Sequence, residues 1–481
     1  MKKVLSTMAL AAVMLMATTT RAENLGAEQA REAAARYMRQ NTAMTRLTSD
    51  QLTLVRQWDN PDLGVPSMYL FTTAGEGWII MAATTCMDPV VGYSDDSDIN
   101  PDCLAPQLEW WLEAYSDLVC QVQDDDAQKS LADSPEWTAM MDENAPVANK
   151  AQIIFAKERW DQGDKNGTDY NMFCPTVNDS VCPVGCVATA MAQICHYYQY
   201  PKTGNGRKAY HWVYTEGGVE KDSLLAVKMD TVSFDYDLMP NKIVAATTHE
   251  ERLEVSRLGY YCGLSVRMQY SPSGSGSYST NVPDAMRVNF KYSNSTLVNR
   301  AGTNAFLSAL RAELMQKRPV YMSGSSPDGG GRDAGGHAWI CCGYYDNDTN
   351  RYYMNWGWNG SGNGFFNLRT NDMAVGSYNF RAGQAIIIGM VPPADSILAV
   401  NEADATVALG HAYPNPASYS VTVPYSLTQA AELQVYDVSG RLVEQRRLES
   451  GNGEATLRVD ALPAGIYVYR LGTAHGKFVV R

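Results

Sequence analysis

Cys186 is the residue of this chain best placed to act as a nucleophile. It follows Pro183 and Gly185, which predict a turn, and it precedes the Ala-rich run 187–194, which favours a helix that ends before Pro201. Unpaired backbone N–H groups and the helix dipole stabilise an anion at such a helix start. The position therefore favours a thiolate, although a buried thiol or one half of a disulfide is the alternative for the same segment.

A candidate general base lies about 150 residues further along the chain. His337 follows Gly335 and Gly336, so we expect it to begin a strand that a neighbouring chain can approach closely. Segment 351–356 follows the polar loop 346–350 and is expected to pair with that strand as a hairpin.

This hairpin would bring Asn355 near His337. An amide oxygen that accepts the imidazole N–H would fix the tautomer and the orientation of the ring. An aromatic packing turn is the alternative for residues 355–358. Acyl transfer also needs donors for an oxyanion, and the backbone N–H of Cys186 and the side-chain amide of Gln162 are the candidates. The set predicts peptide hydrolysis through a thioester, with no cofactor and no metal.

The elements that must position these residues predict an α+β protein of several domains. Segment 27–38 reads as an Ala-rich helix, and strands are expected at 67–72 and 78–83, which makes a small α+β unit of residues 23–148. The polar segment around Pro146 has the character of a cleavable linker. The central domain is expected at residues 149–393.

A composition change near Pro392 marks the C-terminal part. After a linker at 394–409, short alternating runs and turns predict a small antiparallel β-sandwich at 410–481, with strands at 420–423, 433–438, 455–459, 466–471 and 477–480.

Composition and the N-terminus bound the location and the partners. The formal net charge of -13 gives no positive field for nucleic acid or anionic membranes. Lys2 and Lys3, an apolar stretch and Thr20-Arg21-Ala22 predict a signal peptide over residues 1–22, and no other segment is apolar enough to span a membrane. Export permits disulfides among the ten cysteines; Cys174 with Cys182 is the only specific pair expected.

The central motifs resemble the streptopain family of papain-like cysteine peptidases, in family order over roughly residues 152–390. The matching segments are Trp160-Asp161-Gln162-Gly163, Gly185-Cys186-Val187-Ala188-Thr189-Ala190, Tyr200-Pro201, the Gly/Ser loop after Met268-Gln269-Tyr270, Gly335-Gly336-His337-Ala338 and Asn355-Trp356-Gly357-Trp358.

This resemblance implies a papain-like fold with a helical part and an antiparallel β part. It implies Cys186 and His337 as the catalytic pair, Gln162 as the oxyanion donor, and Asn355 or Trp356 as the group that orients the histidine. It places Gly276 and Gly336 in the substrate cleft, and Gly276 stands where streptopain has serine. Substrates would be proteins or peptides, with a tendency towards a hydrophobic residue at P2.

The flanking regions carry resemblances of their own. Residues 23–148 resemble the inhibitory propeptide of the family, notably at 77–80 and 90–94, which implies a zymogen whose propeptide is removed near 148–150. Residues 410–481 resemble the sorting domain of the type IX secretion system, notably at 413–416 and 462–467. That system would then be a partner, and the protein would be secreted or held on the outer cell surface of a Gram-negative bacterium via the periplasm.

Two other functions stay open from the sequence. Cys182, Cys186, His337 and Cys341 could formally ligate zinc in a structural site, which metal analysis of the purified protein would detect. A catalytically silent, peptidase-like adhesin would keep the fold without turnover.

Overall fold

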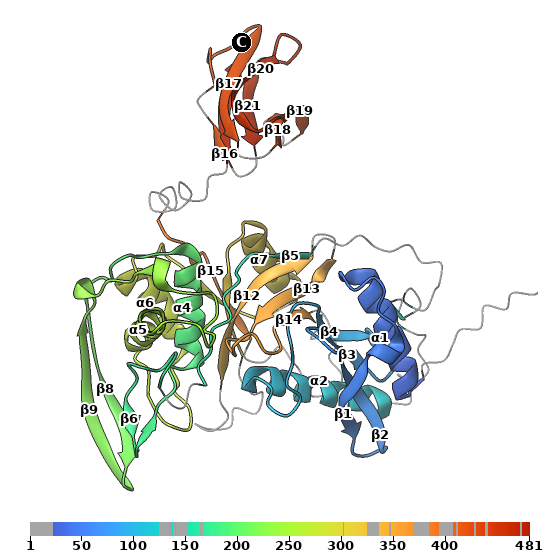
Figure 1. Ribbon diagram of the computed structural model, residues 1–481, viewed down its shortest axis with the longest axis vertical. Coiled ribbons are helices and arrows are strands. Elements are labelled where there is room, and N and C mark those ends of the chain that lie inside the picture. Colours follow the sequence, from blue (N-terminus) through green and yellow to red (C-terminus); the bar gives the residue numbers. More distant parts are fainter. Residues whose placement is uncertain are drawn as a thin grey trace, which may run out of the picture. The chain divides into compact units, whose positions relative to one another are not determined.

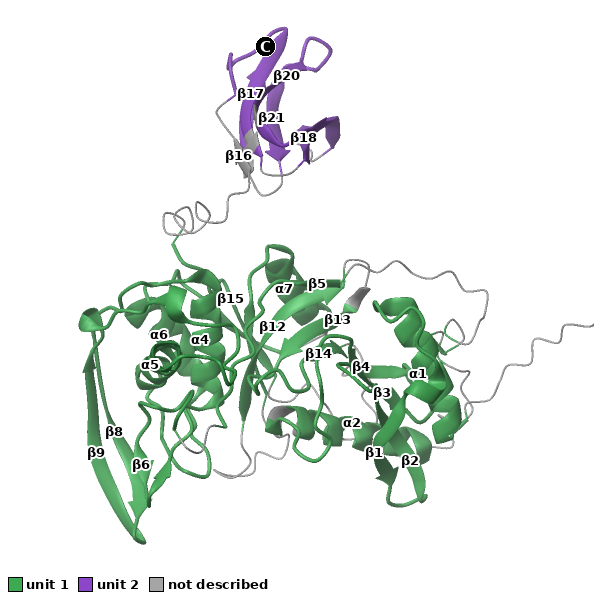
Figure 2. Ribbon diagram, viewed as in Figure 1, with its two compact units in different colours: residues 1–393 green, residues 394–481 purple. Residues whose placement is uncertain are grey.

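The computed structural model describes most of the chain outside its first 22 residues. The described residues are 23–124, 134, 136–137, 140, 152–163, 167–301, 303–324, 336–345, 348–368, 384–393, 407–409, 412–427, 430–437, 441–471 and 474–481. They fall into two compact units, residues 1–393 and residues 394–481 (Figure 2). The expected signal peptide, the expected cleavage site at 148–150 and positions 394–406 of the expected linker lie outside the described residues.

An antiparallel sheet runs through the first unit (Figure 1). Within the described residues it has eleven strands, in the order β1-β2-β3-β4-β14-β13-β12-β11-β15-β10, with β5 paired to β12. Their bounds are β1 Thr53–Asn60, β2 Val65–Thr72, β3 Trp78–Ala82, β4 Val90–Ser94, β5 Gln152–Ile154, β10 Thr296–Asn299, β11 Val320–Gly324, β12 His337–Tyr345, β13 Asp348–Asn355, β14 Gly364–Asn367 and β15 Ala385–Ile388.

Helices cover the two faces of this sheet. On one face lie α1 (Ala27–Asn41) and α4 (Cys186–Tyr198), and on the other lie α2 (Pro106–Asp124) and α7 (Thr303–Met315). Because side chains alternate along a strand, each strand feeds both cores. In β12, Ala338 and Ile340 face the α4 side, whereas Trp339 and Cys341 face the other.

The N-terminal sheet and the central sheet are joined edge to edge. Strand β4 pairs with β14, with Tyr93 opposite Phe365 and Gly92 opposite Phe366. A Cβ on Gly92 would lie 2.6 Å from the Phe366 ring, so glycine permits this close approach. The unit formed by α1, α2 and β1–β4 is the small α+β domain expected from the sequence.

The helical part of the central region packs around α4. It contains α5 (His249–Ser265) and α6 (Val282–Asn289), which lie beside α4 in Figure 1. A long hairpin, β8 (Arg207–Glu216) with β9 (Val219–Lys228), extends from this part through a Gly217-Gly218 turn with positive φ at both glycines. The remaining short elements here are β6 Thr176–Val177, β7 Ser180–Val181, η3 Met229–Thr231, η4 Tyr236–Leu238 and η5 Ser279–Asn281, with η1 Ser49–Gln51 in the N-terminal domain.

The second unit consists of two small antiparallel sheets around one core. One sheet has the order β16-β17-β20 and the other β19-β18-β21-β22. The strands are β16 Val407–Leu409, β17 Ser420–Leu427, β18 Ala431–Asp437, β19 Leu442–Leu448, β20 Gly451–Arg458, β21 Gly465–Leu471 and β22 Ala474–Val480. Residues 407–409, expected in the linker, pair with β17 and so belong to this sheet.

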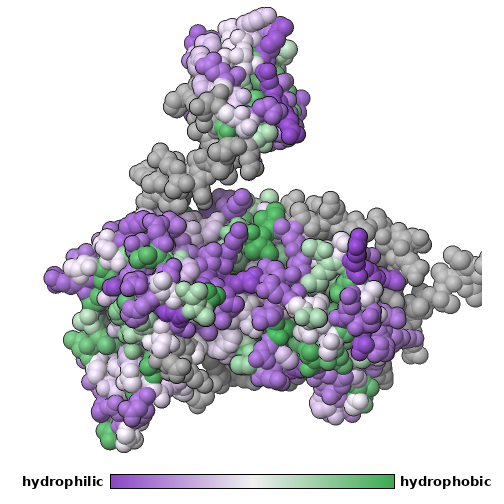
Figure 3. Space-filling model, in the orientation of Figure 1, coloured by the Kyte–Doolittle hydropathy of each residue, from purple (hydrophilic) through white to green (hydrophobic). Residues whose placement is uncertain are grey.

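None of the helices in the described ranges is both long enough and apolar enough to cross a bilayer. On the face shown in Figure 3, hydrophilic and hydrophobic residues are interspersed.

Candidate active site

Helix α4 begins at Cys186, as the sequence predicts. Its N-cap is Gly185, with φ 90° and ψ 146°, a conformation that L-residues rarely adopt. A Cβ on Gly185 would lie 2.8 Å from the carbonyl oxygen of Ser275 and 2.9 Å from Cε of Met268. The glycine therefore allows the loop that follows α5 to pack directly against the start of α4.

The Cys186 thiol is buried, with 8% of the residue exposed. Burial raises its pKa above the ordinary value, and the backbone N–H groups of Ala338, Val187 and Cys186 itself act in the opposite direction. The raised pKa favours the protonated thiol in this arrangement. The three donors are the groups that would stabilise a thiolate once the site became more polar.

His337 is the first residue of β12, also as expected, and pairs with Gly324 of β11. Burial lowers the pKa of its imidazole below the ordinary value. In the described part of the chain, no hydrogen bond or ion pair joins the His337 and Cys186 side chains. The backbone nevertheless brings them close, because the N–H of Ala338, the next residue, is directed at the Cys186 sulfur.

Gln162 lies on the segment that precedes the Cys186 loop in the chain, and it is buried. Its backbone N–H donates to Oδ1 of Asp161 at 2.6 Å. Its carbonyl oxygen accepts a 3.1 Å bond from Nδ2 of Asn171, and Oδ1 of Asn171 accepts a 2.8 Å bond from the N–H of Val184. Gln162 and the residues just before Cys186 are therefore joined through one buried side chain.

Asn355 is the last residue of β13, and Trp356 follows it directly. Asn355 pairs with Ile340, three residues beyond His337, and its side chain bonds elsewhere. Its Nδ2 donates to the Glu158 carbonyl and to Oε1 of Gln193, and its Oδ1 accepts from Gly357 N–H at 3.1 Å. The hairpin is as expected, except that residues 348–350 lie in β13 rather than in the loop.

The Trp356 ring lies on the other face of the sheet. It is 5.3 Å from the Trp339 ring, centroid to centroid, and its Nε1 donates to the carbonyl of Gly362 at 2.9 Å. Trp356 therefore packs against the second residue after His337 in β12.

The two glycines assigned to the substrate cleft are both exposed. Gly276 exchanges two backbone hydrogen bonds with Gln269, of 2.9 and 3.1 Å. A Cβ at Gly276 would meet nothing within 4 Å, so the serine of streptopain would fit here without rearrangement. Gly336 directly precedes β12, next to His337.

The described cysteines form neither a disulfide nor a metal site. No disulfide is present among the described cysteines, and the expected bond between Cys174 and Cys182 is absent; Cys174 lies beside tyrosines 210, 260 and 270 instead. The described residues contain no group of three or more His, Cys, Asp or Glu side chains that could hold a metal. Cys341 faces the core opposite to that of Cys186, so the four formal zinc ligands do not converge.

Sequence reasoning missed two buried polar connections behind this site. One is Asn171, an isolated polar residue for which the sequence carries no distinguishing signal. The other is the pair of His196 and Glu158, whose Nδ1 and Oε1 lie 2.8 Å apart, while His196 Nε2 donates to Met239 O at 2.9 Å. His196 is the eleventh residue of α4 and packs against Trp160 with ring centroids 5.0 Å apart.

Comparison with known families decides the identity of the central region. The profile of the peptidase C10 family matches residues 160–366, the span that carries every candidate residue above. The central region is a domain of the peptidase C10, or streptopain, family of cysteine peptidases. Two further profiles flank it: the Spi protease inhibitor over residues 22–119, and the secretion system C-terminal sorting domain over residues 411–481.

Individual relatives agree with this C10 assignment. The chain is 28% identical over 330 residues to the thiol protease/hemagglutinin PrtT of Porphyromonas gingivalis, which covers 66% of this chain and 36% of that relative. It is 25% identical over 350 residues to streptopain of Streptococcus pyogenes, covering 69% of this chain and 82% of streptopain. The chain thus spans about a third of PrtT and most of streptopain.

The fold is similar to that of a solved structure of prointerpain A. A fragment of prointerpain A from Prevotella intermedia, a Cys-to-Ala mutant, superposes with a TM-score of 0.55 at 23% identity, over 71% of this chain and 98% of the fragment. This likeness confirms the expected α+β fold, and the Spi protease inhibitor profile confirms the N-terminal prodomain. The sorting domain is of the kind that directs secretion across the outer membrane in Bacteroidetes.

Proposed function

We propose that this chain is a secreted cysteine endopeptidase in which Cys186 is the nucleophile and His337 the general base and acid. The single observation that carries the proposal is the position of Cys186. Its sulfur lies at the start of α4 and receives the backbone N–H of the residue next to His337. Membership of the C10 family supports the same assignment.

In the proposed reaction the Cys186 thiolate attacks the carbonyl carbon of a peptide bond. His337 takes the thiol proton, the S–C bond forms, and His337 returns the proton to the leaving amine as the C–N bond breaks. Water then attacks the thioester and His337 takes its proton. As the S–C bond breaks, the acid product leaves and His337 returns the proton to the Cys186 sulfur. The backbone N–H of Cys186 and the side-chain amide of Gln162 would donate to the oxyanion in both steps.

The remaining residues would position these groups and the substrate. Trp356, and Asn355 through the turn that it forms with Gly357, would hold His337 in place. Gly276 and Gly336 would line the cleft for a protein or peptide substrate, which matches their exposure.

The chain would be made as a zymogen. We assign residues 1–22 to a signal peptide, 23–148 to the propeptide, 149–393 to the peptidase and 410–481 to the sorting domain, after a linker of residues 394–409 that β16 shortens. The profile matches to an inhibitor and to a sorting domain support this order. After export to the periplasm, the protein would be released or attached to the outer surface by the type IX machinery.

The test compares the precursor of residues 23–481 with its Cys186→Ala variant. Intact mass, casein cleavage and labelling by a thiol-directed peptidase inactivator are followed together. We expect only the parent to lose a segment of about 125 residues, to cleave casein and to take one label. Casein cleavage by Cys186→Ala at the rate of the parent would show that Cys186 is not the nucleophile. If neither protein is active, both are treated with an added protease before the comparison is repeated.

A further inference from the structure

We propose that Asn171 is a positioning residue for the peptidase reaction, which sets the place of the oxyanion donor Gln162 relative to Cys186. The inference rests on the proposed function. Asn171 is 1% exposed and lies in the helical part of the central region. It carries no charge and cannot transfer a proton at neutral pH, so it would act only through its hydrogen bonds.

Both ends of the Asn171 amide are used. Nδ2 donates to the carbonyl oxygen of Gln162 at 3.1 Å, and Oδ1 accepts from the N–H of Val184 at 2.8 Å. A carbonyl only accepts and a backbone N–H only donates, so the two partners fix which end of the amide faces which. The side chain therefore serves as a rigid bridge between the two segments.

The two bridged segments are the ones that carry the proposed oxyanion donors. Val184 is two residues before Cys186, whose own N–H is one donor, and Gln162 provides the other. The distance between the donors consequently depends on the length of one asparagine side chain. A displacement of about 1 Å in a catalytic arrangement costs up to roughly a hundredfold in rate.

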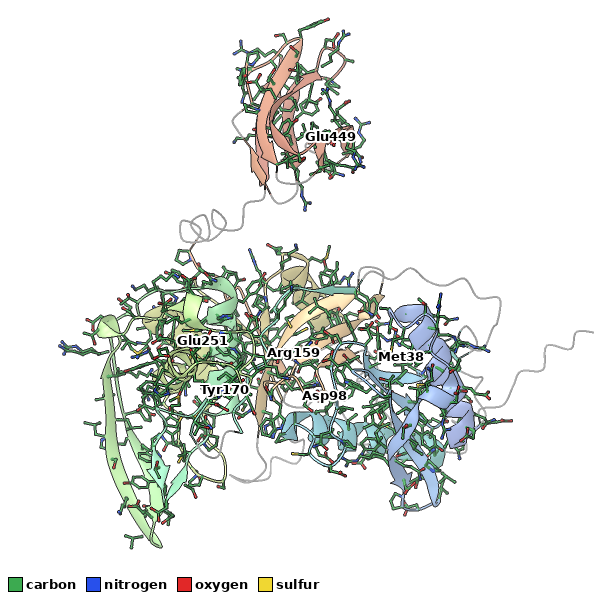
Figure 4. The ribbon with its side chains drawn as sticks, viewed as in Figure 1. Met38, Asp98, Arg159, Tyr170, Glu251 and Glu449 are labelled. Carbon is green, nitrogen blue, oxygen red and sulfur yellow. The ribbon has the colours of Figure 1, made fainter. Side chains whose placement is uncertain are left out.

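The segment around Asn171 is itself firmly held. Asp169 forms an ion pair with Arg252 of α5, and the hydroxyl of Tyr170 accepts from the N–H of Ile243 at 3.2 Å. The carbonyl of Asn171 accepts from Cys174 N–H at 2.9 Å. Figure 4 labels Tyr170 in the helical part, close to α4. A bridge anchored in this way transmits the position of the helical part to Gln162.

Two variants separate positioning from folding. Asn171→Ala removes both hydrogen bonds, whereas Asn171→Asp keeps the size of the side chain, loses the Nδ2 donor and places a carboxylate oxygen against the Gln162 carbonyl. Asn289→Ala is the matched control. Asn289, also 1% exposed, uses its Nδ2 to bridge to Asn205 O at 3.1 Å at the end of α6, outside the proposed site.

All four proteins, residues 23–481, are processed by the same added protease. Three quantities are measured: peptide hydrolysis, the affinity for a peptide aldehyde, and the rate at which iodoacetamide alkylates Cys186. The aldehyde adds the Cys186 sulfur to its carbonyl carbon, and the thiol proton moves to the oxygen, so that oxygen occupies the oxyanion position. Alkylation by iodoacetamide forms no oxyanion and reports on the thiol alone.

We expect kcat/KM and aldehyde affinity to fall by the same factor, roughly ten- to a hundredfold, in both Asn171 variants, with little change in the alkylation rate. Asn289→Ala should change neither. Aldehyde affinity equal to that of the parent, or an alkylation rate that falls by the same factor, would overturn the proposal.

A double variant tests whether Asn171 acts through Gln162. In a Gln162→Ala background, Asn171→Ala should cause no further loss of aldehyde affinity, whereas fully additive losses would show that it acts by another route. Failure of the proposed function looks different, since the parent itself would then hydrolyse no peptide through Cys186. Normal, Cys186-dependent turnover with unaffected Asn171 variants would overturn only the role of Asn171.

Discussion

Cys186 and His337 both have pKa values displaced towards their neutral forms. Burial raises the pKa of the thiol above its ordinary 9.0 and lowers that of the imidazole below its ordinary 6.5. The contribution of Cys186 to the stability of the precursor is present below pH 9.0 and is lost as the pH rises through its higher folded pKa. That of His337 is present above pH 6.5 and is lost as the pH falls through its lower folded pKa. Between these limits burial favours the neutral thiol and the neutral imidazole.

These two pKa shifts predict how the rate of thiol alkylation in the precursor depends on pH. Iodoacetamide should label Cys186 slowly at pH 7, with a rate that rises only above pH 9, because the thiolate is the nucleophile. Peptide mapping by mass spectrometry measures the rate at Cys186 and, as an internal reference for the reagent, at the exposed Cys103. A rate at Cys186 that is already maximal near pH 6 would mean that the precursor holds a charged thiolate–imidazolium pair.

Substitution of Gly185 by alanine has a definite expected result. Alanine there would adopt a disfavoured positive φ and overlap the Ser275 carbonyl, so we expect a loss of about 1–3 kcal/mol in the free energy of unfolding. Peptidase activity should fall further, because α4 would be pushed away from the loop. Gly206→Ala is the control, since Gly206 has φ +70° but open space around it.

Denaturant unfolding of the two glycine variants separates strain from overlap. Gly206→Ala carries only the strain of the left-handed backbone, so Gly185→Ala should be the less stable protein of the two. Equal stabilities, together with unchanged hydrolysis, would contradict the close packing of Ser275 against α4.

At the scale of helices and strands, local sequence patterns predicted some elements and missed others. The start of α4 at Cys186 and of β12 at His337 follow from Gly and Pro punctuation and local propensity. The β8–β9 hairpin was missed, although Gly217-Gly218 between alternating aromatic and β-branched residues is a typical hairpin signal. Strand β19, whose exposed residues include four consecutive polar ones, has no apolar alternation to find.

Long-range pairings are beyond local pattern altogether. Which edges meet, such as β4 with β14, depends on contacts between residues far apart in sequence. The side-chain hydrogen bonds of Asn355 could not be predicted for the same reason. Its hairpin was predictable, but its bonds to Glu158 and Gln193 depend on how α4 packs on the sheet.

The β8–β9 hairpin is tied to the loop that carries Gly276. The Gln269 side chain pairs with the edge of β8 as a third strand would, accepting from Val213 N–H at 3.1 Å and donating to His211 O at 3.2 Å. Trp212 Nε1 donates to Tyr270 O at 2.8 Å. The hairpin therefore holds the backbone that leads into the proposed cleft loop.

Gln269→Ala should consequently raise KM more than it lowers kcat. The loop would lose two hydrogen bonds, each worth about 1 kcal/mol, and would have to be ordered when substrate binds, so we expect a rise in KM of about five- to tenfold. Steady-state kinetics with a set of peptides measures it. Gln316→Ala, at an exposed glutamine that bonds Ala312 O at the end of α7, is the control. Unchanged KM values for every peptide would rule out this role for the hairpin.

Within the first unit, the propeptide is held by sheet pairing and by several polar contacts, one of which is a cluster at Asp96. Arg159, three residues before Gln162, donates to the carbonyl of Asp96 at 2.9 Å and forms a 3.1 Å ion pair with its carboxylate. The Tyr353 hydroxyl also donates to that carboxylate, at 3.4 Å. Asp96 is in the proposed propeptide, and both partners are in the peptidase, so the cluster spans the boundary (Figure 4 labels Arg159).

Asp96→Asn should therefore speed the release of the propeptide. The ion pair is partly exposed, with side chains 27% and 43% accessible, so it is worth no more than about 1 kcal/mol, or about a fivefold change in the rate of appearance of activity. Intact mass and peptide hydrolysis followed over time measure this rate. Asp62→Asn, in the β1–β2 turn, leaves the cluster intact and serves as the control.

Measurements at different ionic strengths show whether the faster release of the propeptide in Asp96→Asn comes from the loss of the ion pair. At about 1 M salt the screening length falls to about 3 Å, so the difference between Asp96→Asn and the parent should shrink if it comes from charge. The β4–β14 pairing is not an ionic contact and would still retain the propeptide of the parent at high salt. A salt-independent difference would instead mean that the substitution disturbs the backbone that follows β4, and equal time courses at low salt would show that the Asp96 ion pair does not set the release.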